Sequence, residues 1–222
     1  MFVISGPSGT GKGAICAGLL EREIAVLSIS MTTRLPREHE VDGKSYYFVK
    51  KAEFEEAIAK DELFEYAEIY GEYYGTPKAP VMKHLEAGTD VILEIDVNGA
   101  RQVKERKPDA VLIFIIPPSP EELKRRIENR GTETPERIAK RLERSESEIS
   151  HIMEYDYCVV NDKLPKAIDD VFAIMRTEKL LRERNLNFLG LWDKVRIRRA
   201  LKMSVLECAE RIINGYKAGR AI

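Results

Sequence analysis

The feature that most constrains the fold is a glycine-rich stretch close to the N-terminus. The sequence "GPSGTGKGAI" follows an apolar run at 2–5, which we expect to form a buried strand. It matches the phosphate-binding pattern G-x-x-x-x-G-K-[ST] as far as Lys12, but Gly13 and Ala14 stand where a hydroxyl-bearing residue would follow. Backbone N–H groups in such a loop, with the positive end of the next helix, bind anions. We therefore predict a strand–loop–helix unit that binds nucleotide phosphates, with Lys12 reaching the β- and γ-phosphates.

This stretch also fits two other interpretations. Gly9, Gly11 and Ala14 also fit the dinucleotide pattern G-x-G-x-x-[GA], but that fold needs an acid after the second strand, where this chain has "SMTTR". A glycine-rich turn without a ligand is the third interpretation. The strand–loop–helix context favours the phosphate loop.

Apolar runs alternate with helical patterns along the chain, which is typical of an α/β fold with a parallel sheet covered by helices. Further strands are expected at 25–30, 46–49, 91–96, 111–116 and 157–160, and helices at 12–22, 51–60, 78–88, 121–130 and 164–184. Ligands of such sheets bind beyond the carboxyl ends of the strands. The glycine loop, Ser30, Glu94 and Asp96 all lie at those ends.

Composition excludes several classes of protein. The chain has 222 residues, of which 44% are hydrophobic and 33% charged, which suits one large domain with a core. A net charge of −1 disfavours a general nucleic-acid or membrane binder. No targeting segment or membrane span is visible, and the scattered cysteines and histidines disfavour a disulfide framework or a zinc site. We expect a cytoplasmic protein.

Four further blocks carry a resemblance to a known family. They are "SMTTRLPREHEVDGKSYYF", "LFEYAEIYGEYYGT", "VILEIDVNGARQV" and "IFIIPPSPEELKRRIENRGTE". Together with the glycine loop, over residues 2–184, they resemble the guanylate kinase family. The resemblance implies a P-loop kinase that transfers the γ-phosphoryl group of ATP to GMP, giving ADP and GDP in purine nucleotide metabolism. It also implies a domain at 1–187, with a GMP-binding subdomain at 31–85 and a lid at about 120–150.

The resemblance implies a GMP site with a phosphate clamp and a guanine pocket. Arg34 and Arg37 offer guanidinium forks suited to the phosphate, and Glu65 matches the carboxylate that accepts hydrogen bonds from guanine N1–H and N2–H₂. Adenine lacks the N2 amino group, so a buried carboxylate would select guanine. The full set is Ser30, Arg34, Arg37, Tyr46, Glu65, Tyr74, Thr76, Glu94 and Asp96. Asp96 is expected at the edge shared by guanine and Arg34.

The resemblance likewise implies an ATP site and a set of catalytic cations. The ATP site comprises Gly6, Pro7, Ser8, Gly9, Thr10, Gly11, Lys12, Gly13, Ala14, Arg130 and Asn161. Lys12, Arg126, Arg137 and Arg141 are the expected catalytic residues. Arg126 and Arg141 are assigned to the transferring phosphoryl group and Arg130 to the adenine. Arg125, Lys140 and Arg144 are interpreted as solvated charges on helices.

The absence of a hydroxyl-bearing residue directly after Lys12 affects how Mg²⁺ can be bound. Mg²⁺ dehydrates reluctantly and can be held by substrate phosphates and water. Gly13 therefore predicts that Mg²⁺ arrives with ATP, with no direct protein ligand. Glu94 or Asp96 is the candidate to hold a metal-bound water, and many family members have Asp where this chain has Glu94.

Two alternatives to a GMP kinase were considered. A non-catalytic protein-binding module of the same family would tend to lose the loop lysine and the lid arginines, which this chain keeps. A related kinase of a ribose bisphosphate would not need the guanine pocket formed by Ser30, Glu65 and Thr76. ATP and GMP are the expected partners, and acceptance of dGMP is left open.

Residues 188–222 extend past the resemblance. A basic cluster precedes apolar residues at helical spacing, which predicts an amphipathic helix. Packing on the core or on a second subunit is one interpretation, and RNA or membrane contact is another. The role of this extension is not assigned.

Overall fold

The structure is a computed structural model that describes all residues except 23, 70, 129–134 and 182–222. The chain divides into two compact units, Met1–Phe172 and Ala173–Ile222. The first unit holds the elements discussed below, and the second is described only as far as Leu181. The helix expected within 188–222 lies outside the described residues.

The first unit is built on a five-stranded parallel sheet with the strand order β2-β7-β1-β8-β9. Its strands are β1 (Phe2–Ser5), β2 (Val26–Leu27), β7 (Val91–Glu94), β8 (Val111–Ile116) and β9 (Tyr157–Val160). This confirms the predicted parallel sheet. All five strands point the same way, so their carboxyl ends meet at one edge, where the glycine loop begins.

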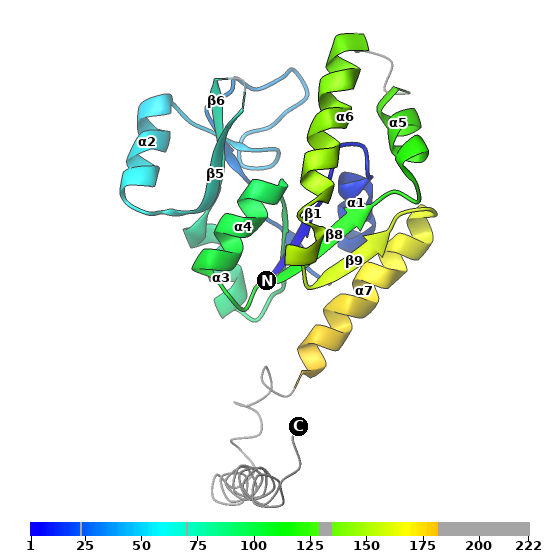
Figure 1. The fold of residues 1–222 in the computed structure, drawn as a ribbon. Coiled ribbons are helices and arrows are strands. Elements are labelled where there is room, and N and C mark those ends of the chain that lie inside the picture. Colours follow the sequence, from blue (N-terminus) through cyan, green and yellow to red (C-terminus); the bar gives the residue numbers. More distant parts are fainter. Residues whose placement is uncertain (23, 70, 129–134, 182–222) are drawn as a thin grey trace, which may run out of the picture. The chain divides into compact units, whose positions relative to one another are not determined.

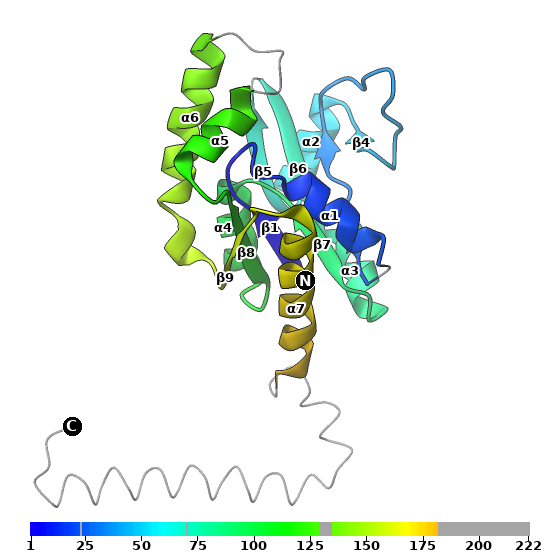
Figure 2. The same ribbon diagram turned by 90° about the vertical axis from the view of Figure 1, so that its right-hand side faces the viewer.

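Helices cover both faces of this sheet. Helix α1 (Lys12–Leu20) lies on one face and α4 (Val97–Arg106) on the other (Figures 1 and 2). Val3 and Leu93 of the sheet pack with Val103 of α4 in one buried cluster, to which Val81 of α3 (Lys78–Glu86) also belongs. Because both faces are covered, the central strands are apolar along their length. All four residues of β1 are buried.

A second sheet lies within the segment expected to bind GMP. Its order is β4-β3-β6-β5, with β3 at Met31–Thr32, β4 at Tyr47–Phe48, β5 at Leu63–Ile69 and β6 at Glu72–Pro77. Strands β5 and β6 form an antiparallel hairpin, and Phe54 of α2 (Lys51–Ala59) stacks on Tyr73 of β6. Of these strands, the sequence predicted only the one near 46–49. The side chains of β5 and β6 pack on α2 and α4, which the sequence does not reveal.

The expected lid contains two helices, α5 (Pro120–Glu128) and α6 (Pro135–Ile149). The first matches the helix predicted at 121–130, and the second lies within 121–154, where the charged residues have helical spacing. Helix α4 was not predicted. It begins after Asp96, whose carboxylate accepts a hydrogen bond from Gly99 N at 2.9 Å and so caps the helix. A short 3₁₀ turn (Ile152–Glu154) precedes β9, and α7 (Leu164–Leu180) follows it. None of the described helices is both apolar enough and long enough to cross a membrane.

Candidate active site

The loop between β1 and α1 has a backbone shape that requires glycine. Gly6, Gly9 and Gly11 have φ angles of 134°, 90° and 90°, in a region that other residues rarely adopt. A Cβ at Gly6 would lie 2.3 Å from the carbonyl oxygen of Ile115, and one at Gly11 would lie 2.4 Å from Asn161 Nδ2. The loop therefore curls tightly against the ends of β8 and β9, which is the arrangement that turns backbone N–H groups toward an anion.

Hydrogen bonds hold the loop in this shape. Thr10 Oγ1 donates to the carbonyl of Pro7 at 2.9 Å, and Asn161 Nδ2 donates to the carbonyl of Thr10 at 2.7 Å. Asn161, expected near the adenine, thus supports the loop directly. Lys12 Nζ donates to the carbonyls of Gly6 and Pro7 at 2.6 and 3.0 Å. Burial lowers the pKa of Lys12, and the carboxylates of Glu94, Glu148 and Asp96 oppose that shift.

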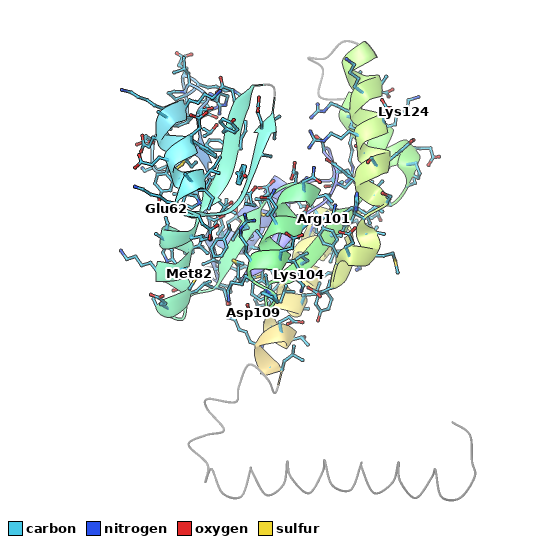
Figure 3. All side chains as sticks on the ribbon, turned by 60° about the vertical axis from the view of Figure 1, so that its left-hand side comes forward. Glu62, Met82, Arg101, Lys104, Asp109 and Lys124 are labelled. Carbon is cyan, nitrogen blue, oxygen red and sulfur yellow. The ribbon has the colours of Figure 1, made fainter. Side chains whose placement is uncertain are left out.

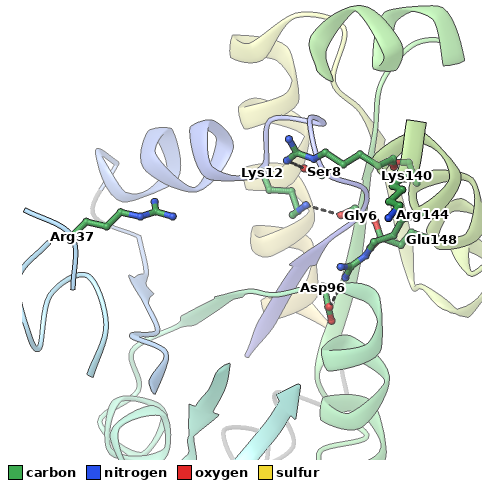
Figure 4. Close-up of a pocket in the computed structure, with 10 residues that line it drawn as sticks. Gly6, Ser8, Lys12, Arg37, Asp96, Lys140, Arg144 and Glu148 are labelled. Atoms are coloured by element: carbon green, nitrogen blue, oxygen red, sulfur yellow. Dashed lines mark hydrogen bonds and ion pairs between the residues drawn. The ribbon is translucent and has the colours of Figure 1, made fainter. Parts of the chain in front are cut away.

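A cavity of about 750 Å³ lies over the loop and is lined by cationic side chains from three segments. Lys12 and Ser8 come from the loop side, and Arg37 comes from the segment after β3. Lys140, Arg141 and Arg144 of α6 form another wall (Figure 4). Lys140 and Arg144 had been interpreted as solvated charges, yet both line this cavity. Such a concentration of positive charge suits a polyanionic ligand.

The catalytic arginines expected on the lid are only partly within the described residues. Arg141 Nη2 donates to Ser8 Oγ at 2.7 Å, which places this cation on the phosphate loop. Arg126 Nη2 donates to the carbonyl of Asn161 at 2.9 Å. Arg137 belongs to α6, but its side chain is not described, and Arg130 lies outside the described residues.

Arg125 and Arg126 also differ in their surroundings. Both pair with Glu122, at 2.7 and 2.6 Å from their Nε atoms. The side chain of Arg125 is 64% exposed and that of Arg126 is 22% exposed. Arg125 is therefore a surface charge, as its sequence context predicted, whereas Arg126 faces the loop region.

A second group of polar side chains lies around Glu65, apart from the main cavity. This carboxylate is buried at the start of the β5–β6 hairpin and accepts a hydrogen bond from Thr76 Oγ1 at 2.6 Å. Ser30 precedes Met31, which pairs with Gly75 next to Thr76, so the three predicted guanine-pocket residues lie in one neighbourhood. Burial raises the pKa of Glu65 to about 7, opposed by the Thr76 hydrogen bond and reinforced by the Asp96 charge. Gly99 leaves room for this side chain, because a Cβ there would lie 2.9 Å from Glu65 Oε2.

The predicted phosphate clamp is assembled around Arg34. Its guanidinium lies 5.5 Å from the ring centre of Tyr46, and the Tyr46 and Tyr74 rings meet edge to face at 6.1 Å. Arg34 Nη2 pairs with Glu40 Oε1 at 2.8 Å, and Arg37 N donates to Glu40 Oε2 at the same distance. These contacts lower the pKa of Glu40 to about 2, with the Arg34 hydrogen bond as the main cause.

Glu40 was not predicted from the sequence. A glutamate three residues after Arg37, in a segment with turn signals, was the only available hint. The Glu40 carboxylate connects the Arg34 side chain to the Arg37 backbone. Besides adding a negative charge, it therefore holds these two residues in place.

Asp96 lines the main cavity, whereas Glu94 lies beside Gly13 at the start of α1. Glu94 Oε1 lies 3.5 Å from the position of a Cβ on Gly13, so the carboxylate stands beside the loop where the usual hydroxyl is missing. Desolvation raises the pKa of Glu94, while Lys12 opposes the shift. Asp96 was expected beside Arg34. In the structure it pairs with Arg144 Nη2 at 3.0 Å, in addition to capping α4.

These features define the class of protein. A glycine loop at the carboxyl edge of a parallel sheet, with a half-buried lysine and converging arginines, is a P-loop nucleotide-phosphate site. The Glu65–Thr76 pair and the side chains around Arg34 form a separate polar group within residues 31–85.

Comparisons with known proteins identify the family. The family model described as guanylate kinase matches residues 1–178, so the chain belongs to the guanylate kinase family. It is 52% identical over 179 residues to a guanylate kinase of Clostridium tetani, covering 81% of this chain and 86% of that protein. A guanylate kinase of Thermus thermophilus is 53% identical over 179 residues, covering 81% of each chain. A crystal structure of guanylate kinase from Anaplasma phagocytophilum superposes with a TM-score of 0.68 at 36% identity, covering 83% of this chain and 88% of that one.

Proposed function

We propose that the protein transfers the γ-phosphoryl group of ATP to GMP, giving ADP and GDP. The observation that carries this proposal is the shared cavity. Lys12 of the loop, Arg141 of α6 and Arg37 of the acceptor segment line the same space of about 750 Å³. Phosphoryl transfer needs the two reacting phosphates in line and charge-neutralised, and little covalent chemistry from the protein.

In this assignment the loop and the lid cations act on the donor. Backbone N–H groups of Gly9–Gly13 hold the β-phosphate, and Lys12 stabilises the negative charge on the transferring group. Arg141 reaches the same group from α6, because its guanidinium already lies on Ser8 of the loop. Arg126, held by the Asn161 carbonyl, adds charge from α5.

The second substrate is recognised by its phosphate and its base. Arg34 and Arg37 bind the phosphate, and the hydroxyls of Tyr46 and Tyr74 donate to it. Ionised Glu65 accepts N1–H and N2–H₂ of guanine, with Thr76 and Ser30 on the O6 side. Adenine would leave the buried carboxylate poorly paired, which costs roughly 1–3 kcal/mol for an unsatisfied group and more for a charged one.

Mg²⁺ is proposed to enter with ATP. Among the described residues, no three or more His, Cys, Asp or Glu side chains gather into a metal-binding group. The carboxylates that act on Lys12 are Glu94, which lies beside Gly13, Glu148 and Asp96. One or two carboxylates that hold metal-bound water, with phosphates completing the shell, fit what Mg²⁺ prefers. When bound, the ion neutralises charge on the β- and γ-phosphates.

We also propose that 31–85 closes on GMP and a lid at about 120–150 closes on ATP, which would exclude water from the transfer. Each contains its own secondary structure, the β4-β3-β6-β5 sheet in the first and α5 with α6 in the second. A domain end near 187 and a cytoplasmic location remain predictions. So does subunit association through 188–222, without a nucleic-acid or membrane partner.

GMP affinity is expected to depend on the protonation of Glu65. The free pocket has a Glu65 pKa of about 7, and the guanine donors require the ionised form. Binding then favours loss of the proton, so affinity should rise with pH through 7 and level off above it. Below 7 it should fall by up to about tenfold per pH unit. Titration calorimetry with GMP between pH 5.5 and 8.5 measures this, and a flat profile in that range would contradict it.

The function is tested by a coupled ADP-release assay with ATP and each of GMP, AMP, CMP and UMP. We expect turnover with GMP and at least about 100-fold lower kcat/KM with the other three. A protein that binds GMP without releasing ADP would instead support the non-catalytic binding module. Turnover with a ribose bisphosphate but not with GMP would support the other kinase.

A further inference from the structure

Helix α6 touches the rest of the site at two points that lie three residues apart. Arg141 donates to Ser8 on the phosphate loop, and Arg144 pairs with Asp96 at the start of α4. Residues at i and i+3 lie on the same side of a helix. One face of α6 therefore contacts the phosphate loop and the entrance to α4 together (Figure 4).

The Arg144 guanidinium is held from two directions. Its Nη2 donates to Asp96 Oδ2 at 3.0 Å, and its Nε donates to Glu148 Oε1 at 2.8 Å, one turn further along α6. Asp96 is itself fixed, because its other carboxylate oxygen accepts from Gly99 N. A planar guanidinium suits such a bridge because its donors point in set directions. The bridge therefore links α6 to a rigid part of the core.

The same residues separate two cavities. Asp96, Arg144 and Glu148 line both the main cavity and a second one of about 370 Å³, which reaches Ile69 of β5 and His151. Arg144 thus forms part of the wall behind the space where the phosphates are proposed to meet. Figure 3 shows α4 and α6 as neighbours from another side.

We propose that Arg144 is a positioning residue for phosphoryl transfer, holding α6 through Asp96 so that Arg141 stays on the phosphate loop. This inference rests on the proposed function and on the role proposed there for Arg141. The Arg144 side chain is 51% exposed, and ion pairs in that setting contribute little to global stability. Its removal should therefore change catalysis more than folding.

The test is a double-mutant cycle on kcat at saturating ATP and GMP. Arg144→Ala is expected to lower kcat about tenfold, with KM for GMP changed less than twofold, because a small displacement of a catalytic group is costly. In an Arg141→Ala background the same change should alter kcat less than twofold. Arg144→Lys should recover part of the loss, since it reaches Asp96 but cannot bridge to Glu148. Arg125→Ala, which removes a surface arginine with a partner on its own helix, is the matched control and should behave as wild type.

Three results would overturn the inference. They are an Arg144→Ala kcat within twofold of wild type, an equal loss with and without Arg141, and an Arg141→Ala protein with wild-type kcat. Thermal unfolding of each variant accompanies the kinetics, and a loss of kcat that tracks a loss of Tm also counts against it. Wild-type kcat is measured in the same series. A wild-type protein without turnover would contradict the proposed function, whereas a wild-type protein with turnover leaves only the role of Arg144 under test.

Discussion

Replacing Lys12 by Met is expected to lower kcat by about 1,000-fold while GMP affinity stays within about threefold of wild type. Lys12 is the half-buried cation of the loop, and its Nζ donates to the carbonyls of Gly6 and Pro7. Met has a similar length and fills the space without the charge. The GMP pocket and its clamp belong to the 31–85 segment, so their contacts should survive. Steady-state kinetics gives kcat, and calorimetry gives GMP affinity.

The control for this change is Lys124→Met. Lys124 is an exposed lysine on α5 that pairs with Glu128, and its replacement should leave kcat unchanged. An equal loss of GMP affinity and of kcat in Lys12→Met would contradict the division between a donor loop and an acceptor pocket. A kcat within tenfold of wild type would contradict the role given to Lys12.

Replacing Glu65 by Gln is expected to weaken GMP binding by about 100-fold or more. The amide keeps one acceptor oxygen for Thr76 Oγ1, so the local fold should persist. It presents an N–H₂ group where the carboxylate accepted a guanine donor, which leaves two donors facing each other. ATP affinity should not change, because no loop residue contacts Glu65. The measurement is calorimetric titration with GMP and separately with ATP.

Glu68→Gln is the matched control for Glu65. Glu68 lies on the same strand, β5, and is exposed. GMP binding should be normal in this variant, and GMP affinity should depend on pH in the same way as in the wild type. If Glu65→Gln binds GMP with unchanged affinity, the proposal that Glu65 recognises guanine is contradicted. Glu65→Gln should also abolish the pH dependence of GMP affinity that is centred near pH 7.

The parallel sheet was predictable because its central strands are buried on both faces. The runs "FVIS" and "VLIFII" read as strands from their apolar composition alone, and the structure gives the same bounds. The second sheet was not predictable in this way. Strand β3 has only two residues, and β5 and β6 contain Glu65, Thr76 and aromatic residues that the pocket requires. Their pairing depends on contacts with α2 and α4 that no local pattern shows.

The candidate site was predictable where a motif fixes backbone shape or matches a family pattern. The glycines of the loop are needed for their φ angles, and Glu65 with Thr76 is brought together as expected. Arg144 and Glu40 were missed for a common reason. Each is a charged residue in a polar segment, and only the folded chain shows that Arg144 reaches Asp96 and that Glu40 reaches Arg34.

The most direct test of the account is to follow ³¹P NMR signals of an ATP and GMP mixture with Mg²⁺ and the wild-type protein. Transfer between the two proposed sites predicts that the GMP phosphorus and the ATP γ-phosphorus disappear together as the signals of GDP and ADP grow in equal amounts. Inorganic phosphate released without GDP, or ATP and GMP signals that do not change, would contradict it.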